Sequence, residues 1–338
     1  MDIGPILPSA PEGVRGWPWS FEMPQDISGQ VEPPTWPRIT VVIPSYNQGQ
    51  FIEETIRSVL HQQYPNLELM IFDGRSTDDT VNVIKKYASQ IDYWESKSDR
   101  GQSHAINKGF QRATGEILAC MNSDDIYTPG ALLRVGKAFS EYPGSATATG
   151  NARFETLSHE LLDTKYPQPF DPAHFLRGGP NPGQPAVLIA RSTYEAVGPI
   201  DETLHASWDL DYWIRVGLVL PDAAHIEIPH DLAVAKLWEG NKASEFDGNA
   251  TEMDVRRIFE NHLVILDKMF RSRDLAPNLR SLRRVAYSRE MIRYAKRCAN
   301  GGRKTEAIKY AFLTALRYPL VLQHRSYWGI FRRIATAG

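Results

Sequence analysis

The amino-acid sequence predicts an α/β protein built on an open, mostly parallel sheet flanked by helices, with a C-terminal helical extension. Three observations support this fold class. Short runs of β-branched residues alternate with amphipathic segments from residue 39 onward, which is typical of right-handed βαβ units. From residue 250 the hydrophobic spacing is helical throughout. The first 38 residues hold eight prolines and three tryptophans, a composition that excludes helix and sheet interiors.

Length and composition agree with a globular protein. The chain has 338 residues, of which 42% are hydrophobic and 23% charged, enough for two domains or for one large domain with an appendage. Its two cysteines, Cys120 and Cys298, lie far apart, which excludes a disulfide framework and a zinc site. We therefore expect a reducing, cytoplasmic location. The N-terminus lacks a signal-peptide pattern, and no apolar run approaches the ~20 residues that span a bilayer.

The elements follow in order along the chain. Residues 1–38 are expected to form an arm packed on the main domain, because tryptophans are unusual in a bare linker. Residues 39–130 form the first half of the predicted domain. The first strand is a short apolar run rich in β-branched residues, as buried parallel strands are. We predict strands at 39–44, 67–72, 91–96 and 116–121, and helices at 51–64, from a cap at 76–79 to residue 87, and at 103–113.

The second half of the domain, residues 131–250, is less regular. It contains predicted strands at 186–190 and 224–228 and a predicted helix at 209–220. Residues 251–338 form a basic helical region. Within it, Gly301 and Gly302 separate two amphipathic halves at 294–319, which predicts one helical hairpin.

Polar side chains follow three of the predicted strands. In open α/β sheets, ligands bind beyond the carboxyl ends of the strands, so these side chains are expected to share one rim. The three clusters are Pro44-Ser45-Tyr46-Asn47, Asp73-Gly74-Arg75-Ser76 and Asn122-Ser123-Asp124-Asp125.

The Asp124-Asp125 pair has two interpretations. Adjacent carboxylates repel unless a cation lies beside them, and their oxygens suit Mg²⁺ or Mn²⁺ with phosphate oxygens completing the shell. Alternatively, the pair forms a turn with a helix cap. The absence of a Gly-x-Gly-x-x-Gly segment after the first strand, and of a P-loop, argues against a dehydrogenase and a P-loop NTPase. A diphosphate would then be held by metal and by basic side chains such as Arg100 and Lys108.

Four motif segments occur in order along the chain. They are Ile43-Pro44-Ser45-Tyr46-Asn47, residues 73–80 from Asp73-Gly74, residues 99–109 from Asp99-Arg100-Gly101, and residues 115–125 ending in Asp124-Asp125. Together they resemble the signatures of glycosyltransferase family 2, and shorter matches follow at 198–202 and 209–213. The resemblance implies a GT-A fold. It also implies inverting transfer of a sugar from a nucleotide sugar, most often a UDP-sugar, to a hydroxyl of a glycan or lipid-linked acceptor in cell-surface polysaccharide biosynthesis, with Mn²⁺ or Mg²⁺ as cofactor.

The resemblance also implies roles for individual residues. The donor would be bound by Pro44, Tyr46, Asn47, Asp73 and Asp124, with Asp73 on the base and Asp124 on the ribose. Arg100 is a further donor-binding candidate because it is a basic residue near the same rim. Asp125 would ligate the metal, Asp209 would be the catalytic base, and Gln184 would contact the acceptor.

Several alternatives remain open at these positions. Asp209 could instead cap a helix, with His205 as the base, and Gln184 could anchor a loop. Trp208 stands where the family often has an acidic residue, and Trp238 where it often has a histidine. The first departure could raise the basicity of Asp209 by partial desolvation, and the second suggests that an auxiliary phosphate or metal contact is lost or comes from elsewhere. Arg75 replaces a common glycine.

The charge of the chain is divided unevenly. Residues 271–338 hold 16 basic and 3 acidic residues, a balance of +13, whereas the remaining 270 residues hold 22 basic and 37 acidic residues, a balance of −15. A basic region of this kind indicates an anionic partner. We expect a peripheral position on the anionic inner face of the membrane, with docking on the acidic body as the alternative. No recognised nucleic-acid module accompanies the region.

Two functions from different classes follow. The first is a metal-dependent glycosyltransferase, which the set Asp73, Asp124, Asp125 and Asp209 favours. The second is a catalytically weak scaffold that binds nucleotide sugar or glycan, which only Trp208 and Trp238 favour. A nucleotidyltransferase is a weaker third interpretation, because no glycine-rich phosphate loop is present.

Overall fold

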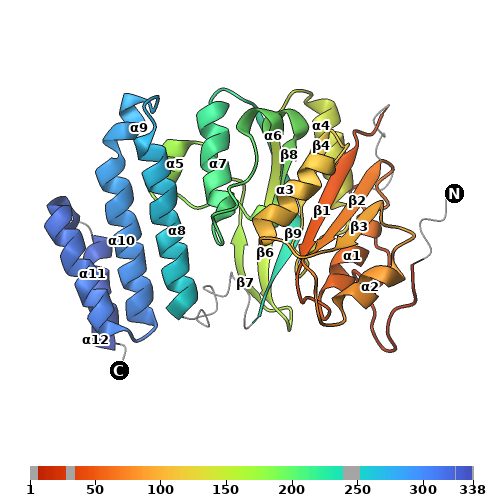
Figure 1. Ribbon diagram of the computed structural model, residues 1–338, viewed down its shortest axis with the longest axis horizontal. Helices are drawn as coiled ribbons and strands as arrows, with labels where there is room; N and C mark the ends of the chain where they lie inside the picture. The colour runs from red at the N-terminus through yellow and green to blue at the C-terminus, as the bar shows by residue number, and fades with distance from the viewer. Residues whose placement is uncertain (1–6, 28–34, 239–251, 324, 337–338) are drawn as a thin grey trace. The chain divides into compact units, whose positions relative to one another are not determined.

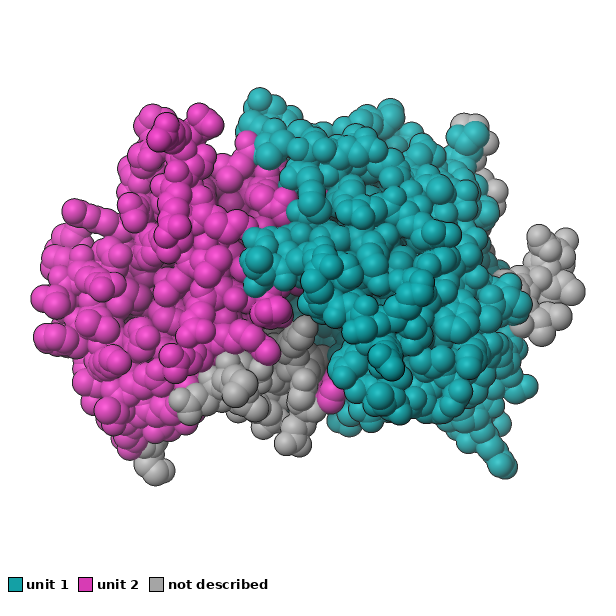
Figure 2. Space-filling model, viewed as in Figure 1, with its two compact units in different colours: residues 1–169, 182–203, 219–236 teal, residues 170–181, 204–218, 237–338 magenta. Residues whose placement is uncertain are grey.

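The computed structural model describes residues 7–27, 35–238, 252–323 and 325–336. The chain divides into two compact units, each assembled from separate stretches of sequence (Figure 2). Unit 1 comprises residues 1–169, 182–203 and 219–236, and unit 2 comprises residues 170–181, 204–218 and 237–338. The predicted boundary at residue 250, between the main domain and the basic helical region, lies outside the described residues. The predicted boundaries at residue 38, after the arm, and at residue 130, between the two halves of the domain, stay predictions.

Unit 1 contains a sheet with the strand order β3-β2-β1-β4-β8-β6-β9-β5 (Figure 1). Its first four strands are parallel and are those predicted from the sequence. They are β1 (Ile39–Ser45), β2 (Leu67–Asp73), β3 (Tyr93–Ser96) and β4 (Ile117–Cys120). All residues of β1 and β4 are buried, which explains why these strands have continuously apolar sequences.

The other half of the sheet is antiparallel. β8 (Val187–Ala190) pairs with β4 and with β6 (Thr147–Thr156), β7 (Leu161–Lys165) pairs with β6, and β5 (Ile126–Tyr127) pairs with β9 (His225–Leu237). The open α/β sheet is thus confirmed, with its parallel part confined to four strands. The strand predicted at 224–228 is longer in the structure and continues to Leu237. The sequence does not indicate this continuation, because Pro229, His230 and Asp231 interrupt the apolar pattern although they do not end the strand.

Helices flank the sheet of unit 1. They are α1 (Ile52–Leu60), α2 (Thr80–Lys86), α3 (Gln102–Arg112), α4 (Ala131–Glu141) and α6 (Arg191–Val197), with a short 3-10 helix, η1 (Gln184–Ala186). α3 packs on β1 and β2. Gly109 permits this close approach, because a Cβ atom there would overlap the side chain of Val42.

The N-terminal arm belongs to unit 1 and packs on the rest of that unit through its described residues. The indole of Trp17 donates a hydrogen bond to the carbonyl of Tyr127 at 2.7 Å, and the guanidinium of Arg57 lies 4.7 Å from the ring centroid of Trp19. Trp36 packs edge-on against Tyr64 with 5.4 Å between ring centroids. The tryptophans therefore attach the arm to the domain, as their apolar surface predicts.

Unit 2 is helical where it is described. Its elements are α5 (Pro172–Leu176), α7 (Trp208–Val219), α8 (Glu252–Arg271), α9 (Pro277–Ser281), α10 (Arg283–Asn300), α11 (Lys304–Arg317), η3 (Pro319–Gln323) and α12 (Arg325–Thr336). α10 and α11 form the predicted hairpin around Gly301 and Gly302, and Gly302 has a φ of +72°, which favours glycine.

The C-terminal helices share a core of their own. Phe259 of α8 stacks on Tyr294 of α10 with 4.3 Å between ring centroids, and both side chains are buried. Ala307, Ala311 and Ile330 complete the same core from α11 and α12. Across the described residues, none of the helices is both long enough and apolar enough to cross a membrane.

Candidate active site

The carboxyl ends of three parallel strands lie level with one another. Ser45 of β1 is in register with Asp73 of β2, and Asp73 with Ser96 of β3. The side chain of Asp73 is fully buried and accepts hydrogen bonds from the hydroxyls of Ser76 and Ser96 and from the backbone N–H of Ser76, the last at 2.9 Å. The predicted base-binding carboxylate is therefore held rigidly at this edge.

The loop after β1 is tied to the loop after β2. Asn47 has a φ of +52°, its side-chain oxygen accepts the N–H of Thr77 at 2.9 Å, and its own N–H donates to the hydroxyl of Ser76 at 2.7 Å. Pro44 is buried within β1, whereas Tyr46 is 61% exposed. Of the three predicted donor contacts in this segment, Tyr46 offers the free surface and Asn47 shapes the loop.

Asp125 lies in a tight turn and is almost fully buried. Its side chain is only 3% exposed, and its two oxygens accept hydrogen bonds from the amide of Asn122 at 2.8 Å and the backbone N–H of Lys236 at 3.1 Å. Burial, together with the neighbouring charge of Asp124, raises the pKa of Asp125 well above its usual range. The turn expected in the alternative interpretation is present, but the expected helix cap is not, because α4 begins after Gly130.

A divalent cation would relieve the charge of this carboxylate pair. Within residues 7–27, 35–238, 252–323 and 325–336, no three His, Cys, Asp or Glu side chains gather into a group that could hold a metal. Mg²⁺ commonly binds through one or two carboxylates together with the phosphates of a substrate. Asp124 and Asp125 therefore fit a cation that binds together with a diphosphate, rather than a cation in a preformed protein cage.

Gln184 belongs to the same polar network. Its amide donates to the carbonyl of Cys120 at 2.9 Å, and its side-chain oxygen accepts from Asn122 at 3.2 Å. The side-chain oxygen of Asn122 accepts in turn from Gln102 at 2.6 Å. These contacts are those expected if Gln184 anchors a loop, which was the alternative role for this residue. A contact between Gln184 and the acceptor stays a prediction.

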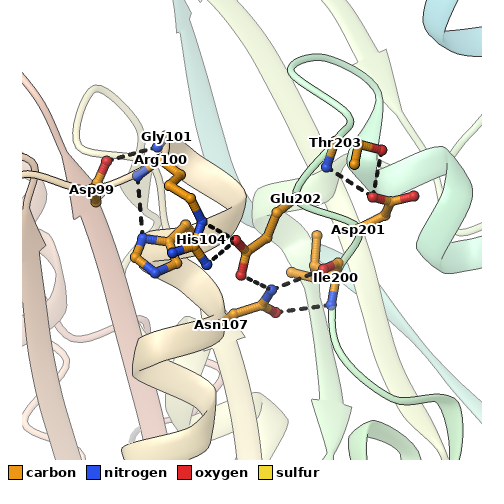
Figure 3. Close-up of polar contacts among 9 residues, drawn as sticks. All are labelled: Asp99, Arg100, Gly101, His104, Asn107, Ile200, Asp201, Glu202 and Thr203. Carbon is orange, nitrogen blue, oxygen red and sulfur yellow. Dashed lines mark hydrogen bonds and ion pairs between the residues drawn. The ribbon is translucent and has the colours of Figure 1, made fainter.

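Arg100 is engaged by a carboxylate from a distant segment (Figure 3). Its guanidinium donates two hydrogen bonds to one oxygen of Glu202, at 2.9 and 2.5 Å, and the other oxygen accepts from Asn107 at 3.1 Å. Burial opposes the charge on Glu202, but the hydrogen bonds from Asn107 and Arg100 outweigh it and lower its pKa. Two motifs about a hundred residues apart are thus joined at this rim.

Lys108 is also paired. Its ammonium donates to Glu95 at 2.6 Å, and burial of Glu95 is outweighed by its hydrogen bonds to Lys108, Lys97 and Tyr93, which lower its pKa to about 2. Both basic side chains that the sequence offered for a diphosphate therefore have carboxylate partners in this structure.

Asp209 belongs to unit 2. It is the second residue of α7 and lies in its first turn, where a carboxylate is favoured by the helix dipole. Because the helix begins at Trp208, Asp209 does not occupy the cap position. His205 lies in the preceding segment and is exposed.

Sequence reasoning missed several residues of this network. Asn122 and Glu202 lie inside motif segments, so their positions were visible, but their roles were not. Gln102 also lies inside a motif segment, at a position that the motif does not specify. Lys236 carried no signal, because it contributes only a backbone N–H, which has no sequence pattern.

Known proteins resemble the chain in sequence and in fold. Residues 40–180 match the model of Glycosyl transferase family 2. The chain is 27% identical over 125 residues to a poly-beta-1,6-N-acetyl-D-glucosamine synthase of Staphylococcus epidermidis, covering 36% of this chain and 30% of that protein. The chain spans 30% to 58% of the length of eight similar curated proteins.

Two solved structures share the fold. A mannosyltransferase from Pyrobaculum calidifontis, in complex with GDP-Man and Mn²⁺, has a TM-score of 0.57 and 18% identity, covering 90% of this chain and 86% of that chain. Residues 1–349 of TarS from S. aureus, in complex with UDP-GlcNAc, have a TM-score of 0.58 and 16% identity, covering 89% and 90%. At these identities the likeness concerns the fold.

Proposed function

Through residues 40–180 the chain belongs to glycosyltransferase family 2, and on that premise we propose that it transfers a sugar from a nucleotide sugar to a hydroxyl of a glycan or lipid-linked acceptor, with inversion at the anomeric carbon. The donor we propose is a UDP-sugar, and the product is a cell-surface polysaccharide. The similarity to a polysaccharide synthase supports this product, and the bound UDP-GlcNAc of a structural neighbour supports the donor class.

The observation that carries the proposal is the buried carboxylate at the edge of the sheet. Asp125 has an environment that penalises its negative charge, beside a second carboxylate and within a network of amides. A site that binds a cation together with a diphosphate explains why such a carboxylate is kept there. The neighbour that contains Mn²⁺ supports the same assignment.

Different residues of the chain have different roles in the proposed reaction. Asp73 holds the base, Tyr46 packs beside it, and Asp124 contacts the ribose. Asp125 would hold Mn²⁺ or Mg²⁺, which supplies positive charge as the nucleoside diphosphate departs. Asp209 takes the proton of the acceptor hydroxyl as its oxygen attacks the anomeric carbon. Arg100 would reach a phosphate only by exchanging its bond to Glu202.

A donor-hydrolysis screen tests the proposal. The purified chain is incubated with UDP-sugars and GDP-mannose in Mn²⁺ or in EDTA, and released nucleoside diphosphate is measured. We expect slow hydrolysis of one donor that requires the metal. Donor binding without hydrolysis above blank would instead favour the catalytically weak scaffold.

We also propose a cytoplasmic location at an anionic membrane face. Ile308, Phe312 and Leu316 lie on one face of α11 and are 47%, 66% and 69% exposed, and Leu320 in η3 is 71% exposed. Such a stripe is unusual on a soluble surface. Exposed basic residues accompany it, namely Lys304, Lys309, Arg317, Arg325 and Arg332. Apolar insertion with basic flanks suits an anionic lipid surface.

A further inference from the structure

A series of polar contacts links two helices of unit 2, α8 and α10, to the residue before α7. Nδ1 of His262, on α8, lies 2.7 Å from a carboxylate oxygen of Glu290, on α10. Nε2 of the same ring lies 3.0 Å from the hydroxyl of Ser207. Arg293 donates to the other oxygen of Glu290 at 2.8 Å. The side chains of His262 and Glu290 are 8% and 12% exposed, so these polar contacts are largely shielded from water.

The charge of Glu290 determines how the imidazole is held. Burial opposes ionisation of Glu290, but His262, Arg293 and Arg297 outweigh it and lower its pKa to about 2. An ionised carboxylate only accepts hydrogen bonds, so Nδ1 of His262 carries the proton that is donated to Glu290. The ring orientation is then set, and Nε2 faces the hydroxyl of Ser207.

α8 holds the start of α7 at further points. The amide of Asn261 donates to the carbonyl of Ala206 at 2.8 Å, and the ammonium of Lys268 donates to the buried carboxylate of Asp211 at 3.0 Å. Ser207 has a φ of +58°, a backbone conformation that is unfavourable for a residue other than glycine and that persists when neighbouring contacts impose it.

We propose that His262 and Glu290 are positioning residues for Asp209. They hold Ser207 in its left-handed conformation, and thereby set the direction in which α7 starts and presents its second residue. This inference rests on the proposed function, in which Asp209 is the base. It makes α8 and α10 part of the catalytic apparatus. A misplacement of about 1 Å can cost on the order of 10² in rate even when the altered residue does not touch the substrate.

The test measures turnover and donor affinity separately. His262→Asn, Glu290→Gln and Ser207→Ala are each compared with the parent in Mn²⁺-dependent hydrolysis of UDP-GlcNAc and GDP-mannose and in calorimetric binding of UDP and GDP. We expect each variant to lose roughly ten- to a hundredfold in kcat with unchanged nucleotide affinity. Tyr287→Phe is the matched control, because it removes another hydrogen bond between α10 and α8, to Asp267, and should leave kcat unchanged.

A double variant separates positioning from general destabilisation. Asp209→Asn alone should lose ~10²–10⁴-fold in turnover, and adding His262→Asn should then cost little more, since His262 acts through Asp209. Full additivity would overturn the positioning role. If Asp209→Asn loses turnover but His262→Asn does not, the positioning role fails while the proposed base stands. If Asp209→Asn keeps its turnover, both fail.

A chemical probe tests an alternative role for Ser207, His262 and Glu290, namely nucleophilic catalysis by the serine. A serine, a histidine and a carboxylate at these distances also suit a nucleophilic serine. The parent chain is treated with a fluorophosphonate and digested for mass spectrometry. We expect Ser207 to remain unlabelled, and labelling of Ser207 that disappears in His262→Asn would overturn the positioning proposal.

Discussion

At Asp125, a buried carboxylate lies beside Asp124 and accepts hydrogen bonds from Asn122 and Lys236. In the proposed site, a bound cation would offset the energetic cost of burying such a group. Asp125→Ala is therefore expected to lower the affinity for UDP in Mn²⁺ to the level measured in EDTA, with no change in EDTA itself. Titration calorimetry measures both values.

The control for this prediction is Asp163→Ala, which removes an exposed carboxylate from β7 in the same unit. It should behave as the parent does. Equal affinities of the Asp125→Ala variant and the parent in Mn²⁺ would rule out the metal-ligand assignment.

At the scale of elements, α3 is joined to the segment before Thr203 by one buried amide. Asn107 donates to the carbonyl of Ile200 and accepts its N–H, both at 2.9 Å, and both residues are buried. Asn107→Ala should lower the free energy of unfolding by about 1–3 kcal/mol, because two buried backbone groups lose their partner. Chemical denaturation measures this.

Arg100→Ala provides the comparison at the same junction. It removes an ion pair in which the arginine side chain is 68% exposed, and exposed pairs contribute less than about 1 kcal/mol. A larger loss of stability from Arg100→Ala than from Asn107→Ala would contradict this account of the junction.

The contact between α8 and α10 predicts a pH dependence. The folded-state pKa of Glu290 is about 2, against 4.5 for the free side chain. The stabilisation, roughly 3 kcal/mol, is fully present above pH 4.5 and is lost as the pH falls from 4.5 toward 2. Unfolding of unit 2, followed by tryptophan fluorescence from pH 6 to pH 2, should show this loss in the parent and a smaller loss in Glu290→Gln. Equal acid profiles would contradict it.

At the scale of the whole molecule, charge and exposed apolar surface coincide in the C-terminal region. Residues 318–331 include eight aromatic and apolar residues, which differ in their burial. Val321, Tyr327 and Ile330 are buried in the helical core, whereas Leu320, Leu322, Trp328 and Phe331 are exposed. The stripe on α11 adds Ile308, Phe312 and Leu316. Each basic residue near an anionic bilayer contributes about 1 kcal/mol, which salt screens.

Vesicle co-sedimentation tests the membrane proposal. The parent should bind vesicles of phosphatidylglycerol and phosphatidylcholine but not of phosphatidylcholine alone, and salt should weaken the binding. Phe312→Glu with Leu316→Glu should abolish it, and Val264→Glu on α8, where the residue is 43% exposed, should not. Point variants are preferable to truncation after Met269, since truncation removes Tyr294 and Glu290, which hold α8.

Two other outcomes are informative. If the parent binds no vesicles but Phe312→Glu dissociates a dimer in light scattering, the stripe binds a second copy of the chain. If neither occurs, neutralisation of the acidic body by the basic region is the better explanation.

Local patterns were sufficient for much of unit 1. The strands β1 to β4 and the helices between them were predicted to within a few residues, because β1, β2 and β4 are almost entirely buried and α1 buries one apolar stripe. The rim followed from the same pattern, since parallel strands end at one edge. The positions of Asp73 and Asp125 at that rim were therefore predictable before any tertiary contact was known.

Tertiary contacts decided the partners of the site residues. Nothing in the segment around Arg100 indicates that its guanidinium meets Glu202, and nothing around Asp209 indicates that His262 and Glu290 support the residue that precedes its helix. These pairs join residues that are 28 to about 100 positions apart in the chain. Sequence periodicity records how an element buries its face, whereas hydrogen-bond partners between elements depend on how those faces meet in space.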